Sequence, residues 1–319
     1  MSWMTFQNMI FAAVVSGTPI LFGTLGEIIN QKAGHLNLGV QGMMAIGGCA
    51  GFMAGYFSGS LTLAILASFA AGSLASLIYA FLTVTMMANQ NVTGLALTTF
   101  GVGLANFIGK TVLSSVGLGT LKLPEGLNSR LSSVIFPDLN RIPVAGKLLF
   151  SYNIFVYMSV VTAIILTLYL HRTKIGRNLR AIGENPSAAD AAGINVVRYK
   201  YFNLLLGGGI CGIGGAYASM MVNNGVWIDN NICEFGWIAV ALVIFAAWNP
   251  SRAILGAFLF GLLKVVRYYM PSAINLPNGF YDMLPFLMTA FVLVITSVKN
   301  SREKSQPMAC GLNYFREER

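Results

Sequence analysis

The chain has 319 residues, of which 55% are hydrophobic and 10% are charged, and its formal net charge is +9. Soluble domains carry about 25% charged residues, so this composition excludes an ordinary soluble enzyme. The positive charge does not indicate nucleic-acid binding, because the basic residues flank apolar runs, where an anionic membrane leaflet accounts for them.

Apolar runs recur along the whole chain, and most approach the roughly 20 residues that a helix needs to cross a bilayer. Because lipid offers no partner to exposed backbone groups, a run that crosses must be helical. We draw the runs 9–29, 37–57, 61–88, 92–113, 151–171, 201–222, 235–248, 252–270 and 283–298. The sequence therefore predicts an all-α, polytopic transmembrane helix bundle of about eight to ten spans.

Two runs differ from the others. The run 37–57 is rich in glycine, and the run 235–248 is short for a span. Interrupted or short apolar segments are typical of the broken helices of transporters. We therefore expect broken or half-crossing helices within a single transmembrane domain, residues 1–298, followed by a tail, residues 299–319.

The positions of Lys and Arg predict the orientation, because cytoplasmic loops keep the excess of positive charge. The connector 172–200 and the tail are both basic, through Arg172, Lys174, Arg177, Arg180, Arg198, Lys200, Lys299, Arg302, Lys304, Arg316 and Arg319. Both are expected to be cytoplasmic, with an even number of spans between them, and the segments 114–150 and 223–234 are expected outside. The amino terminus is outside if 37–57 crosses once and inside if it does not.

Cysteine and histidine do not indicate a metal site. The four cysteines have no paired spacing, and three of them lie in or beside apolar runs, as small core residues do. The two histidines, His35 and His171, fall at expected span ends. No nucleophile, base and orienting group come together in the sequence, so neither a catalytic site nor a metal site is expected.

The connector contains a short helix with both ends marked. Asn185 can cap its start, Pro186 suits its first position, and Gly193 suits the left-handed residue after its last turn. Four alanines between them predict a nearly smooth cylinder that another protein could approach closely. A helix this short needs something to lie against, because it is marginal in water by itself.

The sequence from Arg180 to Asn195 resembles the cytoplasmic coupling segment of permeases in the ribose, nucleoside and branched-chain amino acid class of bacterial ATP-binding cassette (ABC) importers. In that family the segment docks into a groove of the ATPase subunit. The resemblance implies that nucleotide-driven closure of the ATPase pair pushes this helix. The residues that it assigns to ATPase coupling are Arg180, Gly183, Glu184, Asn185, Pro186, Ala188, Ala189 and Gly193.

Three further segments resemble markers of the nucleoside branch of this class, in the same order along the chain. They are residues 34–44, 91–97 and 236–250, so the resemblance covers most of 26–298. The chain departs from that branch at Gln41, where Glu is usual, and in the neutral run 89–91, where acidic residues are common. These departures bear on the identity of the solute.

Polar side chains inside apolar runs are costly and raise the question of what they serve. Candidates for the substrate path are Asn37, Gln41, Asn91, Thr93, Thr98, Asn106 and Trp237. For any single one, a hydrogen bond between helices is the simpler explanation. As a set, they offer the amides, hydroxyls and aromatic surface that a nucleoside needs. Glu27, at an expected cytoplasmic span end, is expected to pair with Lys32.

Two glycine patterns imitate nucleotide-binding motifs. Gly207-x-Gly209-x-x-Gly212 lies within an apolar run with no strand before it, so we expect Gly208, Gly212 and Ala216 to pack closely against other helices. The sequence 103–111 ends in Gly-Lys-Thr, but with the wrong spacing for a phosphate loop. We therefore expect a transport subunit without an ATPase site or bound cofactor, with ATP and Mg²⁺ on a partner ATPase.

The resemblance implies a permease that imports a nucleoside or a related ribose-containing solute across the bacterial cytoplasmic membrane by alternating access. Its expected partners are an ABC ATPase, a second permease of different sequence, an extracytoplasmic solute-binding lipoprotein and membrane lipid, with no nucleic acid. Two alternatives stay open: a stand-alone secondary transporter or channel for a small polar solute, and the permease of a sugar or branched-chain amino acid importer.

Overall fold

The computed structural model describes residues 3–117, 119–135, 146, 148, 150–230, 232–269, 277–298 and 306–315. The helices are α1 (Trp3–Lys32), α2 (Val40–Ser58), α3 (Leu61–Ala80), α4 (Gln90–Val116), α5 (Glu125–Ser132), α7 (Ile154–Arg172), α8 (Lys174–Glu184), α9 (Pro186–Ala191), α10 (Val196–Tyr217), α11 (Cys233–Phe245), α12 (Pro250–Tyr269) and α13 (Asn278–Val298). Short π-helical turns, Phe81–Thr85 and Ala218–Val222, extend α3 and α10. Each predicted apolar run coincides with one helix, which confirms the all-α fold.

Five helices of the described residues are both long and apolar enough to cross a membrane: Met4–Lys32, Leu61–Thr85, Gln90–Val116, Ile154–Arg172 and Val196–Val222. The chain is therefore a multi-pass membrane protein. The glycine-rich α2 runs unbroken for 19 residues, so the interruption that its composition suggested is not present. By contrast, α11 has 13 residues, or about 20 Å at 1.5 Å per residue, which is too short to cross the roughly 30 Å hydrocarbon core.

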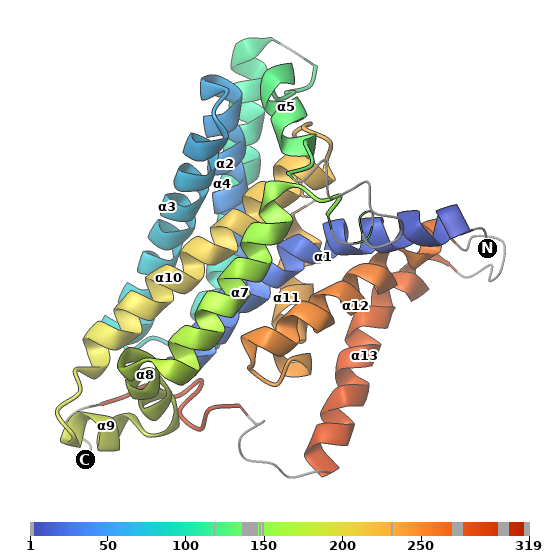
Figure 1. The fold of residues 1–319 in the computed structure, drawn as a ribbon. Coiled ribbons are helices and arrows are strands. Elements are labelled where there is room, and N and C mark those ends of the chain that lie inside the picture. The colour runs from blue at the N-terminus through green and yellow to red at the C-terminus, as the bar shows by residue number, and fades with distance from the viewer. Residues whose placement is uncertain are drawn as a thin grey trace.

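The long helix α10 lies at the centre of the bundle and packs against α1, α2 and α3 (Figure 1). The helix α12 packs along α1, and α13 stands at the edge of the molecule, beside α11 and α12. The helix α7 lies across α1 and leads into α8 and α9. The apolar surface that α3, α4 and α13 leave exposed is the surface that lipid or another protein chain must cover.

Close approach of α10 to α3 depends on small residues, as the glycine spacing predicts. A Cβ atom added at Gly208 would lie 2.3 Å from the Ser76 Cβ, and one added at Gly212 would lie 2.2 Å from the Ser68 carbonyl oxygen. The Ser76 hydroxyl uses this proximity to donate a hydrogen bond of 2.6 Å to the Leu204 carbonyl. Small residues therefore let the helix backbones touch, which is a common way to join helices in membranes.

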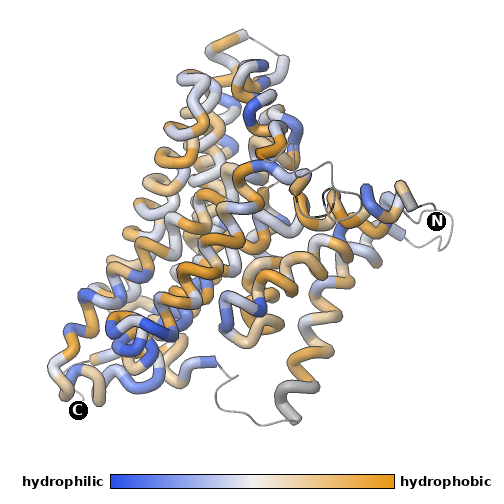
Figure 2. Tube along the Cα trace, viewed as in Figure 1, coloured by the Kyte–Doolittle hydropathy of each residue, from blue (hydrophilic) through white to orange (hydrophobic). Residues whose placement is uncertain are grey.

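The two ends of the bundle are polar and its middle is apolar (Figure 2). The connector and residues 306–315 lie at the same end, because the Ala309 N–H donates a hydrogen bond of 2.9 Å to the Gly183 carbonyl. This agrees with the predicted even number of spans between them. The basic residues predicted for the tail lie outside the described residues. Residues 121–123 and 225–227 pair at the opposite end, beside α5.

Candidate functional site

The helix α9 has the ends that its sequence predicts. The Asn185 side-chain oxygen accepts a hydrogen bond of 3.0 Å from the Ala188 N–H, and Pro186 is the first helical residue. Gly193, after the last turn, has a φ of +80°, in the left-handed region that favours glycine. Sequence alone therefore predicted both the start and the stop of this helix correctly.

The alanines of α9 divide between two faces. Ala188, Ala191 and Ala192 are exposed, whereas Ala189 is only 4% exposed and packs with Ile182 and Val196. Ala189 therefore anchors α9 to α8 and α10. The smooth surface that a partner can approach is one side of the helix and not its whole circumference.

The preceding helix, α8, is fixed against the rest of the bundle. A Cβ atom added at Gly183 would lie 2.4 Å from the Lys32 carbonyl oxygen, so glycine is required for this approach of α8 to the end of α1. Arg180 is half-buried and Glu184 is exposed. All the residues that the resemblance assigns to ATPase coupling are thus brought together at one end of the molecule.

A buried polar cluster lies directly behind this end. The Glu27 carboxylate accepts hydrogen bonds from the Asn30 side chain at 3.1 Å, the Gln31 side chain at 2.8 Å and the Asn37 backbone N–H at 3.1 Å. Glu27 thus has three partners other than Lys32, so the predicted pairing is replaced by a network. This network joins α1 to the loop that leads into α2.

Three of the predicted path residues serve local structure. The Asn37 side-chain oxygen accepts a hydrogen bond of 2.8 Å from the Gly39 N–H, next to the start of α2. The hydroxyl of Thr98 donates to the Leu38 carbonyl at 2.9 Å, and that of Thr93 donates to the Asn89 carbonyl at 2.8 Å. Their polar atoms are thus already engaged near the beginnings of α2 and α4.

The other predicted path residues do not form one cluster with these. Asn91 is exposed at the start of α4, while the Asn106 side chain bonds to that of Asn230 at 2.6 Å, toward the opposite end. Gln41 is buried, and its side-chain oxygen has no hydrogen-bond partner among the described residues. Its backbone touches Gly236, the residue before Trp237.

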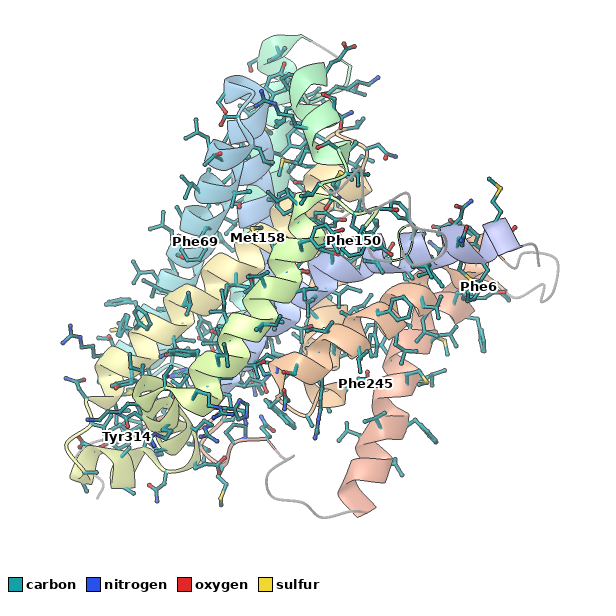
Figure 3. The ribbon with its side chains drawn as sticks, viewed as in Figure 1. Phe6, Phe69, Phe150, Met158, Phe245 and Tyr314 are labelled. Carbon is teal, nitrogen blue, oxygen red and sulfur yellow. The ribbon has the colours of Figure 1, made fainter. Side chains whose placement is uncertain are left out.

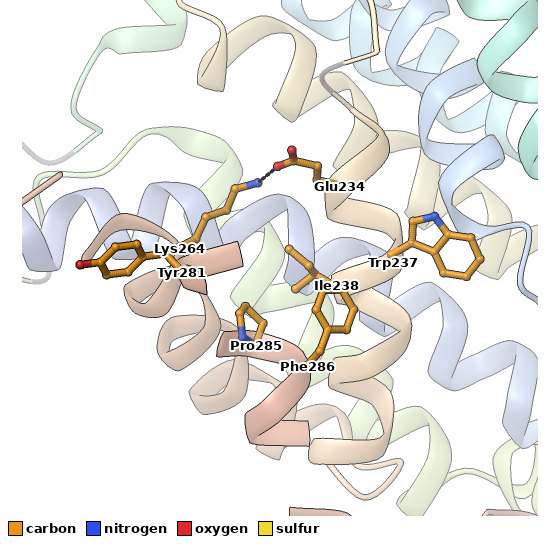
Figure 4. Close-up of a pocket in the computed structure, with 7 residues that line it drawn as sticks. All are labelled: Glu234, Trp237, Ile238, Lys264, Tyr281, Pro285 and Phe286. Atoms are coloured by element: carbon orange, nitrogen blue, oxygen red, sulfur yellow. Dashed lines mark hydrogen bonds and ion pairs between the residues drawn. The ribbon is translucent and has the colours of Figure 1, made fainter. Parts of the chain in front are cut away.

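Trp237 lines a cavity of about 400 Å³ between α11, α12 and α13 (Figure 4). The Lys264 ammonium lies 3.1 Å from the Glu234 carboxylate and 3.7 Å from the centre of the Phe235 ring, so one cation is held by an anion and an aromatic face. Among the described residues, the lining is Glu234, Trp237, Ile238, Lys264, Tyr281, Pro285 and Phe286.

Sequence reasoning named Trp237 as a candidate for the substrate path but did not name the residues that line this cavity with it. Lys264 stands inside the apolar run 252–270, and a cation in such a run is a signal that could have been followed. Tyr281 and Phe286 carried no such signal, because aromatic residues are common in apolar helices. Only the packing of α13 against α11 and α12 brings them to the cavity.

Comparison with known proteins shows what this architecture belongs to. The chain is 32% identical to the nucleoside ABC transporter permease protein NupC of Lactococcus lactis, with 98% of both chains covered. It is 30% identical to the guanosine ABC transporter permease protein NupQ of Bacillus subtilis, over 97% of this chain and 96% of that one. It is 34% identical to a putative glucose ABC transporter permease protein, TsgC13, of Haloferax volcanii, over 80% of this chain and 75% of that one.

Among solved structures, an inward-facing conformation of a putative metal-chelate type ABC transporter resembles the chain with a TM-score of 0.45 and 16% identity, over 91% of this chain and 85% of that one. The model of a protein family described as the permease component of branched-chain amino acid transport systems matches residues 9–293. This match spans nearly all of the helical bundle. The chain therefore belongs to the family of branched-chain amino acid transport system permease components.

Proposed function

We propose that the chain is the membrane-spanning permease of an ABC importer that carries nucleosides or related ribose-containing solutes. The observation that carries this proposal is the similarity, over almost the whole of both chains, to permeases named for nucleosides and for guanosine. The aromatic and charged lining of the cavity at Trp237 is compatible with such a solute.

The complete importer would contain an ABC ATPase, a second permease of different sequence and an extracytoplasmic solute-binding lipoprotein. ATP and Mg²⁺ would bind to the ATPase, and this chain would bind no cofactor of its own. The end that holds α8 and α9 would face the cytoplasm across the bacterial inner membrane, together with the C-terminal segment. Because α1 leads toward this end, the amino terminus would lie on the outside.

The exposed alanine face of α9 is the surface that we assign to the ATPase. Small side chains allow a partner to approach the helix backbone closely, and Gly193 leaves the end of the helix equally open. A push on α9 would pass to α8 and α10 through the buried side chains of Ile182, Ala189 and Val196. Since α10 packs against α1, α2 and α3, the displacement would reach the centre of the bundle.

The cavity lined by Trp237 is the part of the solute path that we assign on this chain. Its volume of about 400 Å³ falls within the range of about 300–1,000 Å³ that is usual for small-molecule sites. The indole of Trp237 and the ring of Phe286 offer surfaces on which a base can stack. The Glu234–Lys264 pair offers an acceptor and a donor for the hydroxyls of a ribose.

The test is solute uptake by proteoliposomes that contain the assembled importer, with its binding protein outside and ATP at the ATPase. We expect ATP-dependent uptake of labelled guanosine or uridine that unlabelled nucleosides compete and glucose does not. Uptake by this chain alone, driven by an ion gradient, would instead show a secondary transporter and would contradict the proposal.

A sugar importer is the second candidate, because the putative glucose permease of Haloferax volcanii is 34% identical over 80% of the chain. The same assay separates the two candidates. Competition by glucose or free ribose, and none by nucleosides, would move the assignment to a sugar.

A further inference from the structure

Residues 306–315 form no helix or strand, yet they are held at the end of the molecule that bears α8 and α9. Figure 3 shows Tyr314 at this end, beside α9. The segment lies between two parts of the chain that are far apart in sequence, the connector 172–200 and the turn that joins α3 to α4. We refer to residues 306–315 as the C-terminal segment.

The first set of contacts ties the C-terminal segment to the α3–α4 turn. The Asn313 side-chain amide donates hydrogen bonds to the carbonyls of Met87 and Ala88, at 2.5 and 3.3 Å. The Gln90 side chain, at the start of α4, donates to the Leu312 carbonyl at 3.2 Å. Met87 has a φ of +54°, an uncommon value for a residue other than glycine, so the amide of Asn313 supports a turn of unusual shape.

The second set ties the C-terminal segment to the coupling helices. The Tyr314 hydroxyl donates a hydrogen bond of 2.8 Å to the Asp190 carboxylate of α9, and the Ala309 N–H donates to the Gly183 carbonyl of α8. The Tyr314 ring also packs against the small apolar cluster that holds α9, which contains Ala189 and Val196. Consecutive residues, Asn313 and Tyr314, thus bond to two segments that are far apart in the sequence.

We propose that Asn313 and Tyr314 are positioning residues that link the coupling helix α9 to the α3–α4 turn. A displacement of α9 then reaches α4 directly, in addition to its route through α8 and α10. The hydrogen bonds to the Asp190 carboxylate of α9 and to the backbone carbonyls of the turn favour narrow distances and near-linear geometry, so a displacement of α9 pulls on the turn through them. This inference rests on the proposed function, because it presupposes that α9 is pushed by an ATPase.

The test measures the number of solute molecules taken up per ATP hydrolysed by the complete importer in proteoliposomes. The variants Tyr314→Phe, Asp190→Ala and Asn313→Ala each remove hydrogen bonds of the link. We expect each to lower this ratio about three- to tenfold, the range for losing one hydrogen bond of ordinary net strength, while ATP hydrolysis continues. Asp190→Asn keeps an acceptor for the Tyr314 hydroxyl and is expected to restore the ratio.

Matched controls come from the same segment. The side chains of Met308 and Leu312 are exposed, so Met308→Ala and Leu312→Ala are expected to leave the ratio unchanged. An unchanged ratio in Tyr314→Phe and Asn313→Ala would overturn the inference, as would an equal loss in the two controls.

A second measurement keeps the inference testable if a variant does not assemble with its partners. Burial raises the pKa of the Cys310 thiol to about 12, so the anchored C-terminal segment is expected to react slowly with a maleimide. The measurement uses membranes that contain the chain with Cys233→Ser, in which Cys49 and Cys211 are buried and labelling reports on Cys310. In this background, we expect Tyr314→Phe to accelerate maleimide labelling several-fold. An unchanged labelling rate would overturn the inference.

Failure of the proposed function has a different signature. Ala188→Trp places a large side chain on the exposed face of α9, away from the C-terminal segment's hydrogen bonds. If Ala188→Trp leaves ATPase assembly and uptake intact, the assignment of α9 to the ATPase fails. If Ala188→Trp abolishes assembly while Tyr314→Phe leaves the ratio unchanged, only the link is contradicted.

Discussion

The end of the molecule that bears α8 and α9, which we propose as the coupling end, and the cavity between α11, α12 and α13 are built in different ways. At the proposed coupling end, the exposed surface belongs to one short helix, whose start and stop follow from adjacent residues. The cavity takes its residues from three consecutive helices, and no local pattern marks their meeting. A surface on one short helix can be encoded locally, whereas a cavity lined by several helices must be assembled by their packing.

The largest effect expected from this comparison separates the two faces of α9. Ala189→Glu would bury a charge in the apolar cluster with Ile182 and Val196, at a cost of about 3–5 kcal/mol, so the chain should not accumulate in the membrane. Ala188→Glu places the same charge in solvent and should leave the amount of chain unchanged. Quantifying the membrane-inserted chain checks this.

Because Ala188→Glu is expected to accumulate in the membrane, this variant can report on binding of the ATPase. Ala188→Glu is expected to weaken binding of the ATPase about tenfold or more, because a charge would be desolvated in the contact. Co-purification of the ATPase with each variant measures this. Equal accumulation of the two variants would show that the two faces of α9 do not differ as the structure indicates.

The next effect tests the local stop signal of α9. Gly193→Val forces a β-branched residue into a left-handed conformation, at a cost of about 1–2 kcal/mol, although nothing within 4 Å would touch its Cβ atom. We expect ATP-dependent uptake to fall about fivefold or more, and Gly193→Asn to retain most of it, because Asn tolerates this conformation. Equal uptake by both variants would show that the backbone shape there is irrelevant to coupling.

A smaller and more selective effect is expected in the cavity. Trp237→Ala removes the stacking surface and should raise the KM for nucleoside uptake about tenfold, since stacking on a base contributes about 1–3 kcal/mol. Trp237→Phe keeps an aromatic face and should raise the KM less. Basal ATP hydrolysis should not change in either variant, which distinguishes a defect of the solute path from one of the coupling end.

The smallest effect concerns His35, at the coupling end. Burial, with a further contribution from Lys200, holds the pKa of His35 well below its usual value near 6.5. The folded chain then binds a proton at His35 less readily than the unfolded chain does, so stability is lost as the pH falls below about 6.5. In thermal melts in detergent between pH 7.5 and about 5.5, the Tm of His35→Leu should depend less on pH than the Tm of the unsubstituted chain. An equal change of Tm with pH in both chains would contradict this.

Most of the fold could be predicted because lipid imposes one strict condition on the backbone. Each apolar run had to become a helix, and each did, including the short α11. The glycine pattern at Gly208 and Gly212 was also interpreted correctly as close helix packing. The unbroken course of α2 was not expected, because glycines weaken an isolated helix. In the structure, the glycines of α2 pack against neighbouring helices, which hold the helix together.

The candidate site was predictable only in part. Asn37, Thr93 and Thr98 were chosen because they are polar. Asn37 and Thr93 bond to backbone groups of their own segments, and Thr98 joins α4 to the residues before α2. Polarity in a span indicates that a partner exists, but it does not say whether that partner is a solute or a backbone carbonyl. Trp237 was chosen as an aromatic surface for a base, and it does line a cavity, but its role in the solute path stays a prediction.

What the sequence by itself determined is the class of protein and the two ends of the short helix α9. Apolar length requires membrane helices, and Asn185, Pro186 and Gly193 set the ends of α9 through bonds and backbone angles that involve neighbouring residues only. Only the tertiary structure decided that Ala189 faces inward, that Lys264 meets Glu234, and that Tyr314 reaches α9. Those contacts join residues that are 30 to 124 positions apart, or belong to different helices, so their formation depends on how the whole bundle packs.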